Sequence, residues 1–284
     1  MSTSRSWVVG LVGVAVGAFA TARPGEAEKS GPSPAAAGSL RAVVYAQAGS
    51  ETRACALQAY RLAERLLDEG LADPCWTADV EQEAEGGYAC KPPAVVLDVD
   101  ETVLDNAPYN ARLLRAVLDG KAESDAYDSA AWARWSEQRA ASPIPGARSF
   151  LRKAVDRGVA VFYVTNRKDS ERQATYDNLV AAGLPATLEA VRPTDPAAPK
   201  DRAWDKGPRR RAIAATHRIV LLVGDDLNDF VGGTKAVPAA ERERVLLAHR
   251  ARVGTRWVVL GNAMYGGWWD AVRADPAAAL RTGE

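Results

Sequence analysis

Cysteine and histidine are scarce in this chain, and their scarcity excludes several kinds of site. Three cysteines in 284 residues are too few for a disulfide scaffold, and no two of them form the CxxC pair of a zinc site. Two histidines leave little room for a histidine-based metal centre or a Ser-His-Asp triad. Lys and Arg number 36, as do Asp and Glu, so the net charge is zero. Because proteins that bind nucleic-acid polymers usually carry a basic surplus, we expect no such partner.

Long apolar runs are also missing, except at the N-terminus. Residues 7–20 are uncharged and apolar, follow Arg5, and end before the small-x-small pattern Ala20-Thr21-Ala22. This pattern predicts a signal peptide over residues 1–22 and therefore a periplasmic or secreted protein. A buried N-terminal helix and an uncleaved membrane anchor are the alternatives. No second run approaches the roughly 20 residues of a membrane-spanning helix, so we expect no span in the mature protein.

The region before the first predicted strand divides into a linker and a helical segment. Residues 23–38 are rich in Pro, Gly, Ser and Ala and are typical of a flexible linker. Residues 39–93 form an N-terminal segment that we expect to pack on the core. Apolar residues from Leu57 to Leu67 recur at helical spacing, and Gly70 is a plausible helix end.

A loop is expected over residues 73–93, where Pro and Gly are frequent. Cys75 and Cys90 flank this loop and could close a small ring in an exported protein. Alternatively, one or both remain reduced, or Cys55 is the partner.

Residues 94–284 form the predicted core. Three apolar, β-branched runs begin near residues 94, 160 and 218. One helix-like stretch, residues 146–157, precedes the second run, and two more, residues 170–182 and 208–216, lie between the second run and the third. This alternation is typical of a parallel α/β sheet.

Polar residues follow all three predicted strands. The first ends in Asp98 and Asp100, the second in Thr165-Asn166-Arg167, and the third is followed by Asp225, Asp226 and Asp229. Ligands of parallel sheets bind at the carboxyl ends of the strands. The carboxylates suit a hard cation, most simply Mg²⁺, although a solvated strand end would also account for Asp98 and Asp100 taken alone. With the Lys200–Arg211 basic stretch, they suit a phosphoryl group.

The motifs resemble one known family. DVDET (98–102) within LDVDETVLDNAPY (97–109), YVTNR (163–167), KGPR (206–209) and GDDLNDF (224–230) resemble the four motifs of class C acid phosphatases, the lipoprotein e-type 5'-nucleotidases of the haloacid dehalogenase-like superfamily. The resemblance runs from about residue 45 to residue 269. It implies a Rossmannoid parallel sheet with helices on both faces and a small helical cap, here residues 105–145.

The resemblance also implies roles for individual residues. Asp98 would be the nucleophile that forms an aspartyl-phosphate, and Asp100 the general acid and base. Thr165 and Asn166 would hydrogen-bond the phosphoryl oxygens, and Lys206 would neutralise them. Mg²⁺ would be held by Asp98, by the backbone carbonyl of Asp100 and by Asp225, with Asp229 supporting its water shell or Lys206.

Two departures from the family pattern bear on the site and on the N-terminus. The usual GDN is Gly224-Asp225-Asp226 here, which predicts one more negative charge beside the metal. No Cys follows the apolar N-terminal run, and the first is Cys55. We therefore expect no lipid anchor.

Aromatic residues are the candidates for substrate recognition. Trp132 and Trp135 lie three apart on a predicted cap helix, which favours core packing but leaves Trp135 as a candidate substrate contact. In the family, the Tyr of a Tyr-Gly-Gly-Trp segment stacks on the substrate base, and Tyr265 holds that position here.

The sequence therefore predicts an exported, Mg²⁺-dependent acid phosphatase whose substrates are small phosphomonoesters, nucleoside 5'-monophosphates in particular. A phosphotransferase with the same intermediate is one alternative. A non-catalytic phosphate-binding or storage protein is another, since plant vegetative storage proteins of this branch can lose the nucleophile. The presence of Asp98 disfavours that alternative. A homodimer is left open.

Overall fold

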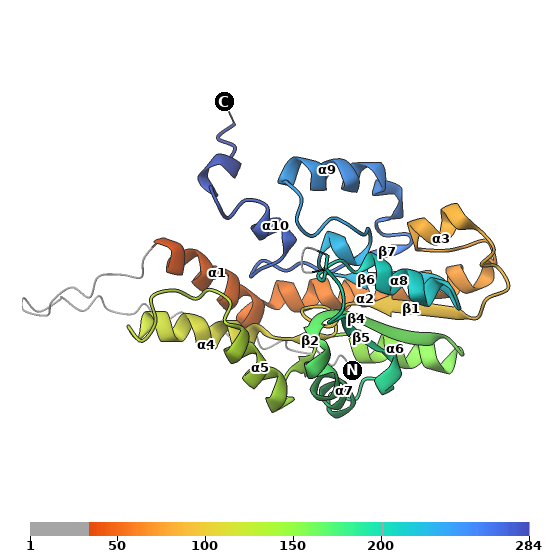
Figure 1. Ribbon diagram of the computed structural model, residues 1–284, viewed down its shortest axis with the longest axis horizontal. Coiled ribbons are helices and arrows are strands. Elements are labelled where there is room, and N and C mark those ends of the chain that lie inside the picture. The colour runs from red at the N-terminus through yellow and green to blue at the C-terminus, as the bar shows by residue number, and fades with distance from the viewer. Residues whose placement is uncertain (1–33, 200–201, 284) are drawn as a thin grey trace, which may run out of the picture. The chain divides into compact units, whose positions relative to one another are not determined.

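The computed structural model describes residues 34–199 and 202–283, with side chains from residue 38 (Figure 1). The predicted signal peptide and most of the predicted linker lie outside these residues. Helix α1 (Pro34–Ala48) includes residues 34–38, which were predicted as linker, and α2 (Ser50–Ala72) follows it. The predicted helical segment therefore begins as two helices, separated at Gly49. A Cβ at Gly49 would lie 2.5 Å from the carbonyl oxygen of Tyr45, so only glycine fits this break.

A five-stranded parallel sheet is the centre of the fold (Figure 1). Its strand order is β5-β4-β1-β6-β7, so the three predicted strands are adjacent and central. Their bounds are β1 (Pro93–Leu97), β4 (Ala160–Lys168), β5 (Val191–Thr194), β6 (Arg218–Gly224) and β7 (Trp257–Val259). The predicted α/β class is confirmed. The two edge strands, β5 and β7, were not predicted.

Helices cover both faces of the sheet, as expected. Alternate residues of a strand point to opposite faces, and β1 shows this directly. Val95 and Leu97 pack in one buried cluster with residues of α2 and of α6 (Ala147–Asp156), whereas Val96 packs in another with Ile213 of α8 (Gly207–Ala214). The strands are buried on both sides and for this reason are continuously apolar.

The segment over residues 73–93 differs from its predicted form. The predicted loop over residues 73–93 contains a short helix, α3 (Val80–Glu85), which begins where the Asp79 carboxylate accepts the N–H of Gln82. Cys75 and Cys90, near the ends of this predicted loop, and Cys55 of α2 are free and exposed. None of the disulfides that the sequence left open is therefore formed. Three further helices are α7 (Arg172–Ala181), α9 (Ala239–Ala248) and α10 (Gly267–Asp270).

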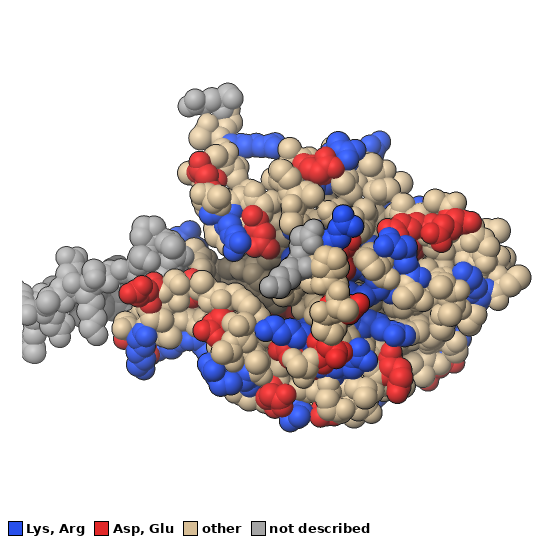
Figure 2. Space-filling model, in the orientation of Figure 1, with Lys and Arg blue, Asp and Glu red and all other residues tan. Residues whose placement is uncertain are grey.

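The insertion at residues 105–145 follows the carboxyl end of β1. It contains α4 (Ala107–Leu118) and α5 (Ser129–Gln138), and its ends pair as the short antiparallel strands β2 (Leu104–Asp105) and β3 (Ser142–Pro143). In the described part of the chain, no helix has the length and apolar character needed to cross a membrane. Figure 2 shows basic and acidic side chains interspersed over the viewed face, in keeping with the zero net charge.

Candidate active site

The carboxyl ends of the three central strands bring most of the predicted site residues together. Asp98 directly follows β1, Thr165 lies in β4, and Asp225 directly follows β6. These strands are neighbours in the sheet, so residues 60 or more positions apart in the sequence meet at one edge. This is the edge at which parallel sheets bind their ligands.

Lys206 is the buried cation at this edge. Its Nζ lies 2.6 Å from Asp98 Oδ1 and 2.6 Å from Asp229 Oδ1. Burial alone would lower the pKa of Lys206, but the neighbouring charges of Asp229 and Asp98 raise it above its usual value. Lys206 is therefore a permanent positive charge beside the predicted nucleophile.

Asp229 has no free oxygen after these contacts. Its Oδ1 accepts from Lys206, and its Oδ2 accepts the backbone N–H groups of Asp225 and Asp226 at 3.1 and 2.9 Å. It thereby fixes the turn after β6. The role as a support for Lys206, one of the two predicted for it, matches these contacts better than direct metal ligation.

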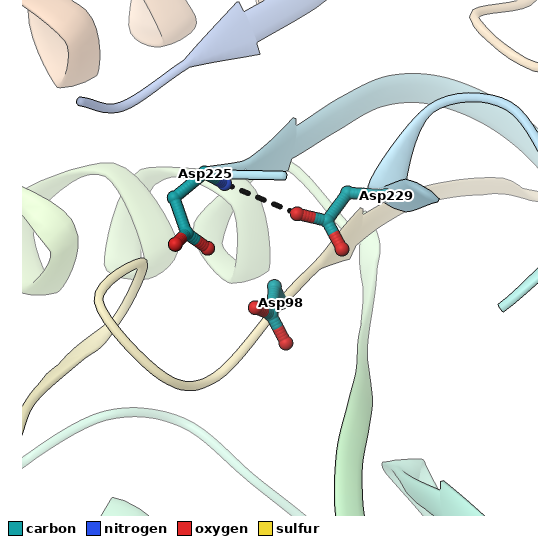
Figure 3. Close-up of side chains that lie close together, drawn as sticks. All are labelled: Asp98, Asp225 and Asp229. Atoms are coloured by element: carbon teal, nitrogen blue, oxygen red, sulfur yellow. Dashed lines mark hydrogen bonds between the residues drawn. The ribbon is translucent and has the colours of Figure 1, made fainter. Parts of the chain in front are cut away.

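Three carboxylates form a cluster that could hold a cation. One oxygen each of Asp98, Asp225 and Asp229 lies within 4.8 Å of the other two (Figure 3). Burial raises the pKa of Asp98 well above its usual range, and burial together with Asp229 raises the pKa of Asp225 to about 7. Such carboxylates are stable as anions only beside a counter-charge, and an all-oxygen set suits Mg²⁺. Asp225 also accepts hydrogen bonds on both oxygens, from Thr102 and Asn262. Asp229 has the most protein donors of the three, so Asp98 and Asp225 are the better candidate ligands.

Asp100, the predicted acid and base, is paired with a buried arginine. Arg167 donates from Nε and Nη2 to Asp100 Oδ1 at 3.0 and 2.8 Å, and its side chain is only 1% exposed. Asn106 Nδ2 also donates to Asp100 Oδ1 at 2.8 Å. The Asp100 side chain is thus absent from the cation cluster, consistent with the expectation that only its backbone carbonyl would serve the metal.

Trp135 supports this arrangement from the core. Its indole N–H donates to Asn106 Oδ1 at 2.7 Å, and the ring is buried in the main core cluster with Trp132. Arg167 in turn lies over the Trp132 ring at 5.3 Å. A buried ring cannot stack on a substrate, so this structure places Trp135 behind Asp100 and not at a substrate-facing surface.

The predicted phosphate-binding residues of β4, Thr165 and Asn166, are contacted by Arg209 near the carboxyl end of the strand. Thr165 Oγ1 lies 3.4 Å from Asp100 Oδ2 and accepts the N–H of Arg167. Asn166 Oδ1 accepts from Arg209 Nη2 at 2.7 Å, and Arg209 Nη1 donates to the Thr165 carbonyl. Burial lowers the pKa of Arg209 to about 10, so its guanidinium stays charged at neutral pH.

Tyr265 lies in a C-terminal aromatic segment, residues 262–269, that contacts the same edge. Asn262 Nδ2 donates to Asp225 Oδ2 at 2.9 Å, which ties the segment to a predicted metal ligand. Tyr265 is partly buried, and its hydroxyl has no hydrogen-bond partner among the described residues.

Asp226, the extra acid of this loop, has two cations of the chain beside it. Its carboxylate faces Lys235 and Arg242, each 3.6 Å away. Burial alone would raise the pKa of Asp226, but these cations and the N–H groups it accepts lower it below its usual value. The extra acid predicted at this position therefore carries its charge next to Asp225, and that charge is paired with Lys235 and Arg242.

Sequence reasoning missed the roles of Arg167, Asn106 and Asn262. Arg167 and Asn106 stand inside the quoted motifs, so their positions were visible, but the pairing with Asp100 is a tertiary contact. Asn262 stands in no motif, and its only sequence signal is its place three residues before Tyr265.

Comparison with known proteins gives the family. A family model described as HAD superfamily, subfamily IIIB (Acid phosphatase), matches residues 31–268. The chain is 26% identical to Acid phosphatase 1 of Solanum lycopersicum and 25% identical to the Stem 28 kDa glycoprotein of Glycine max. Each alignment covers 140 residues, 49% of this chain and 52% of the relative. The chain thus spans about half the length of the curated relatives it matches.

Solved structures agree with the family model. Two structures of the class C acid phosphatase from Bacillus anthracis, one with tungstate bound, superpose with a TM-score of 0.72 and are 28% and 30% identical. Each alignment covers 88% of this chain and 99% of that chain. These findings confirm the resemblance drawn from the four motifs. The protein belongs to subfamily IIIB of the haloacid dehalogenase superfamily, the acid phosphatases.

Proposed function

We propose that this protein is an exported, Mg²⁺-dependent phosphomonoesterase that acts on nucleoside 5'-monophosphates through an aspartyl-phosphate on Asp98. The observation that carries the proposal is the contact between Asp98 and Lys206, 2.6 Å apart and buried at the carboxyl edge of the sheet. A buried carboxylate between a fixed cation and a second acid, Asp225, is placed to attack phosphorus while the phosphoryl charge is neutralised. The tungstate bound by the Bacillus anthracis relative, an oxyanion of phosphate-like shape, supports an anion site in this fold.

In the first step, an Asp98 oxygen forms a bond to phosphorus and the bond between phosphorus and the leaving oxygen breaks. Asp100 gives that oxygen its proton. Lys206 keeps its charge throughout and stabilises the transferring group. Asp98 and Asp225 would hold Mg²⁺, which supplies further neutralisation of the phosphoryl oxygens.

In the second step, Asp100 accepts a proton from water, and the water oxygen attacks phosphorus. The bond between phosphorus and Asp98 breaks, which releases inorganic phosphate and restores the carboxylate. Both steps need Asp100 at one fixed place, and the hydrogen bonds from Arg167 and Asn106 supply that constraint.

Nucleotide preference in this proposal depends on the aromatic segment. The residues of the phosphoryl site bind the phosphoryl group and not the leaving group. Any preference between substrates must therefore come from residues outside that site. Tyr265, at the same edge as Asp225, offers a ring face to a base, and stacking on it tolerates purine and pyrimidine alike. Trp135 is not included, because it is buried and its N–H is already bonded to Asn106.

Phosphate release from a nucleoside 5'-monophosphate and from glycerol phosphate, each with Mg²⁺ and with a chelator, tests the proposal. We expect the chelator to abolish release, added Mg²⁺ to restore it, and the nucleotide to be the better substrate. Tyr265→Ala should lower kcat/KM for the nucleotide about ten-fold, from lost stacking, and leave glycerol phosphate nearly unchanged. An equal loss of kcat/KM on both substrates in Tyr265→Ala would refute the nucleotide preference and leave a general phosphatase. Full activity of the wild type in the chelator would refute the metal dependence.

Export is tested separately, by sequencing the N-terminus of the protein recovered outside the cytoplasm. We expect it to begin at or near Arg23. An intact Met1 there would contradict cleavage and favour an uncleaved anchor.

A further inference from the structure

We infer that Asp226 and Arg242 act as a clasp that fixes the C-terminal aromatic segment, residues 262–269, against the loop after β6 and so sets where Tyr265 stands relative to the reacting phosphoryl group. They are positioning residues, since neither is part of the reacting set. The inference rests on the proposed function for its effect on substrate, but the clasp itself can be tested without any substrate.

Two adjacent acids of the loop hold two ends of the segment. Asp225 Oδ2 accepts from Asn262 Nδ2 at 2.9 Å, and Asn262 Oδ1 accepts the N–H groups of Met264 and Tyr265. Asp226 Oδ2 accepts the N–H of Gly267 at the other end, where α10 begins. Tyr265 therefore lies between two anchor points that both belong to the loop of the predicted metal ligand.

The second anchor is a buried, compensated charge. The Asp226 side chain is 10% exposed, with Lys235 and Arg242 each 3.6 Å away. Arg242 belongs to α9, and its Nη1 also donates to the Thr234 carbonyl at 2.7 Å. A partly buried carboxylate without cations beside it would be costly, so removing Arg242 weakens the acceptor that holds Gly267.

Packing is loose at the Trp268 end of the segment. A cavity of about 310 Å³ lies there, bounded by Trp268 of the segment, Trp257 and Val259 of β7, and Leu246 of α9, with Asp226 and Arg242 at its wall. No residue of α9 is buried. Met264 of the segment packs against Val43 and Leu114, whereas the end at Gly267 and Trp268 borders the cavity and is held there by the polar contacts.

Gly267 shows how tightly the clasp is built. A Cβ there would lie 2.4 Å from Arg242 Nη1 and 2.8 Å from Asp226 Oδ2. Only a residue without a side chain allows the backbone N–H to approach the carboxylate while the guanidinium stays in place. Gly267→Ala thus disturbs the clasp from the segment side, because its Cβ would crowd both Arg242 and Asp226.

The test compares Arg242→Gln and Gly267→Ala with Arg244→Gln, a control on the same helix. Arg244 is exposed and pairs only with Glu241 among the described residues. We expect both test variants to speed hydrogen exchange across residues 262–269. They should also raise KM for a nucleoside 5'-monophosphate about three- to ten-fold, with kcat and the glycerol phosphate reaction close to wild type. The control should change none of these.

The outcomes separate the clasp from the proposed function. Unchanged exchange in both variants overturns the clasp. An equal fall of kcat on both substrates also overturns it, because the residues would then support the catalytic loop and not the segment. Faster exchange supports the clasp even if the wild-type enzyme shows no preference for nucleotides, a result that would refute the proposed substrate class alone.

Discussion

Asp225→Asn is expected to inactivate the enzyme and yet stabilise the metal-free protein above neutral pH. Burial and Asp229 raise the pKa of Asp225 to about 7 in the folded, metal-free chain, against an ordinary value of 3.8. A group whose folded pKa is raised stabilises the fold while it is protonated. The contribution is complete below about pH 4 and is lost as the pH rises toward 7.

The size of the effect follows from that difference. About three pKa units at 1.36 kcal/mol each correspond to about 4 kcal/mol of unfolding free energy, lost by the metal-free wild type between pH 4 and pH 8. Asparagine carries no charge to bury, and its amide oxygen can still accept the hydrogen bond from Asn262. We therefore expect the metal-free variant to exceed the wild type by about 2–4 kcal/mol at pH 8 and to match it near pH 4.

Urea unfolding in a chelator at pH 4.5 and pH 8 measures this difference. Added Mg²⁺ should stabilise the wild type at pH 8 and leave Asp225→Asn unchanged, since the variant has lost a ligand. Glu189→Gln, at an exposed carboxylate outside the site, is the control and should show no pH-dependent gain. A variant no more stable than the wild type at pH 8 would refute the reasoning from a buried, uncompensated carboxylate.

Three further substitutions test the site. Asp98→Asn should abolish phosphate release with the circular dichroism spectrum unchanged, because an amide does not attack phosphorus at a useful rate. Arg167→Met should lower kcat by about 10²-fold with little change in KM, and should cost far less when Asp100 is already Asn, since Arg167 acts through Asp100. Gly224→Ala should lower the melting temperature markedly, as its Cβ would lie 2.2 Å from Asp229 Oδ2; an unchanged melting temperature would mean that the turn after β6 can relax.

The centre of the fold was predictable because its strands are buried on both faces. Strands β1, β4 and β6 lie inside the sheet, so their sequences are apolar over four to seven residues and stand out. The edge strands β5 and β7 are short, and β5 contains Pro193. A short run with a proline carries no strand signal of its own, and such strands form because a neighbouring strand offers them hydrogen bonds.

The positions of the site residues were predictable, but their partners were not. A motif such as YVTNR gives the location of Arg167 at the end of β4. Its contact with Asp100 depends on the side-by-side pairing of β1 and β4 and on Asn106, which the insertion after β1 brings back to the same place. The same limit applies to Trp135, whose aromatic ring is equally compatible with substrate stacking and with core packing until its N–H is seen bonded to Asn106.

Asp225 and Asp226 show why charge counted along the sequence misleads at such a site. The two residues are adjacent, and the sequence places two negative charges beside the metal. At the end of a strand, successive side chains point in different directions. Burial and the carboxylate of Asp229 therefore raise the pKa of Asp225, whereas the cations Lys235 and Arg242 outweigh burial and lower the pKa of Asp226. Asp225 thus requires a bound cation to be stable as an anion. Asp226 is neutralised by Lys235 and Arg242, and its carboxylate accepts the N–H of Gly267 in the segment that contains Tyr265.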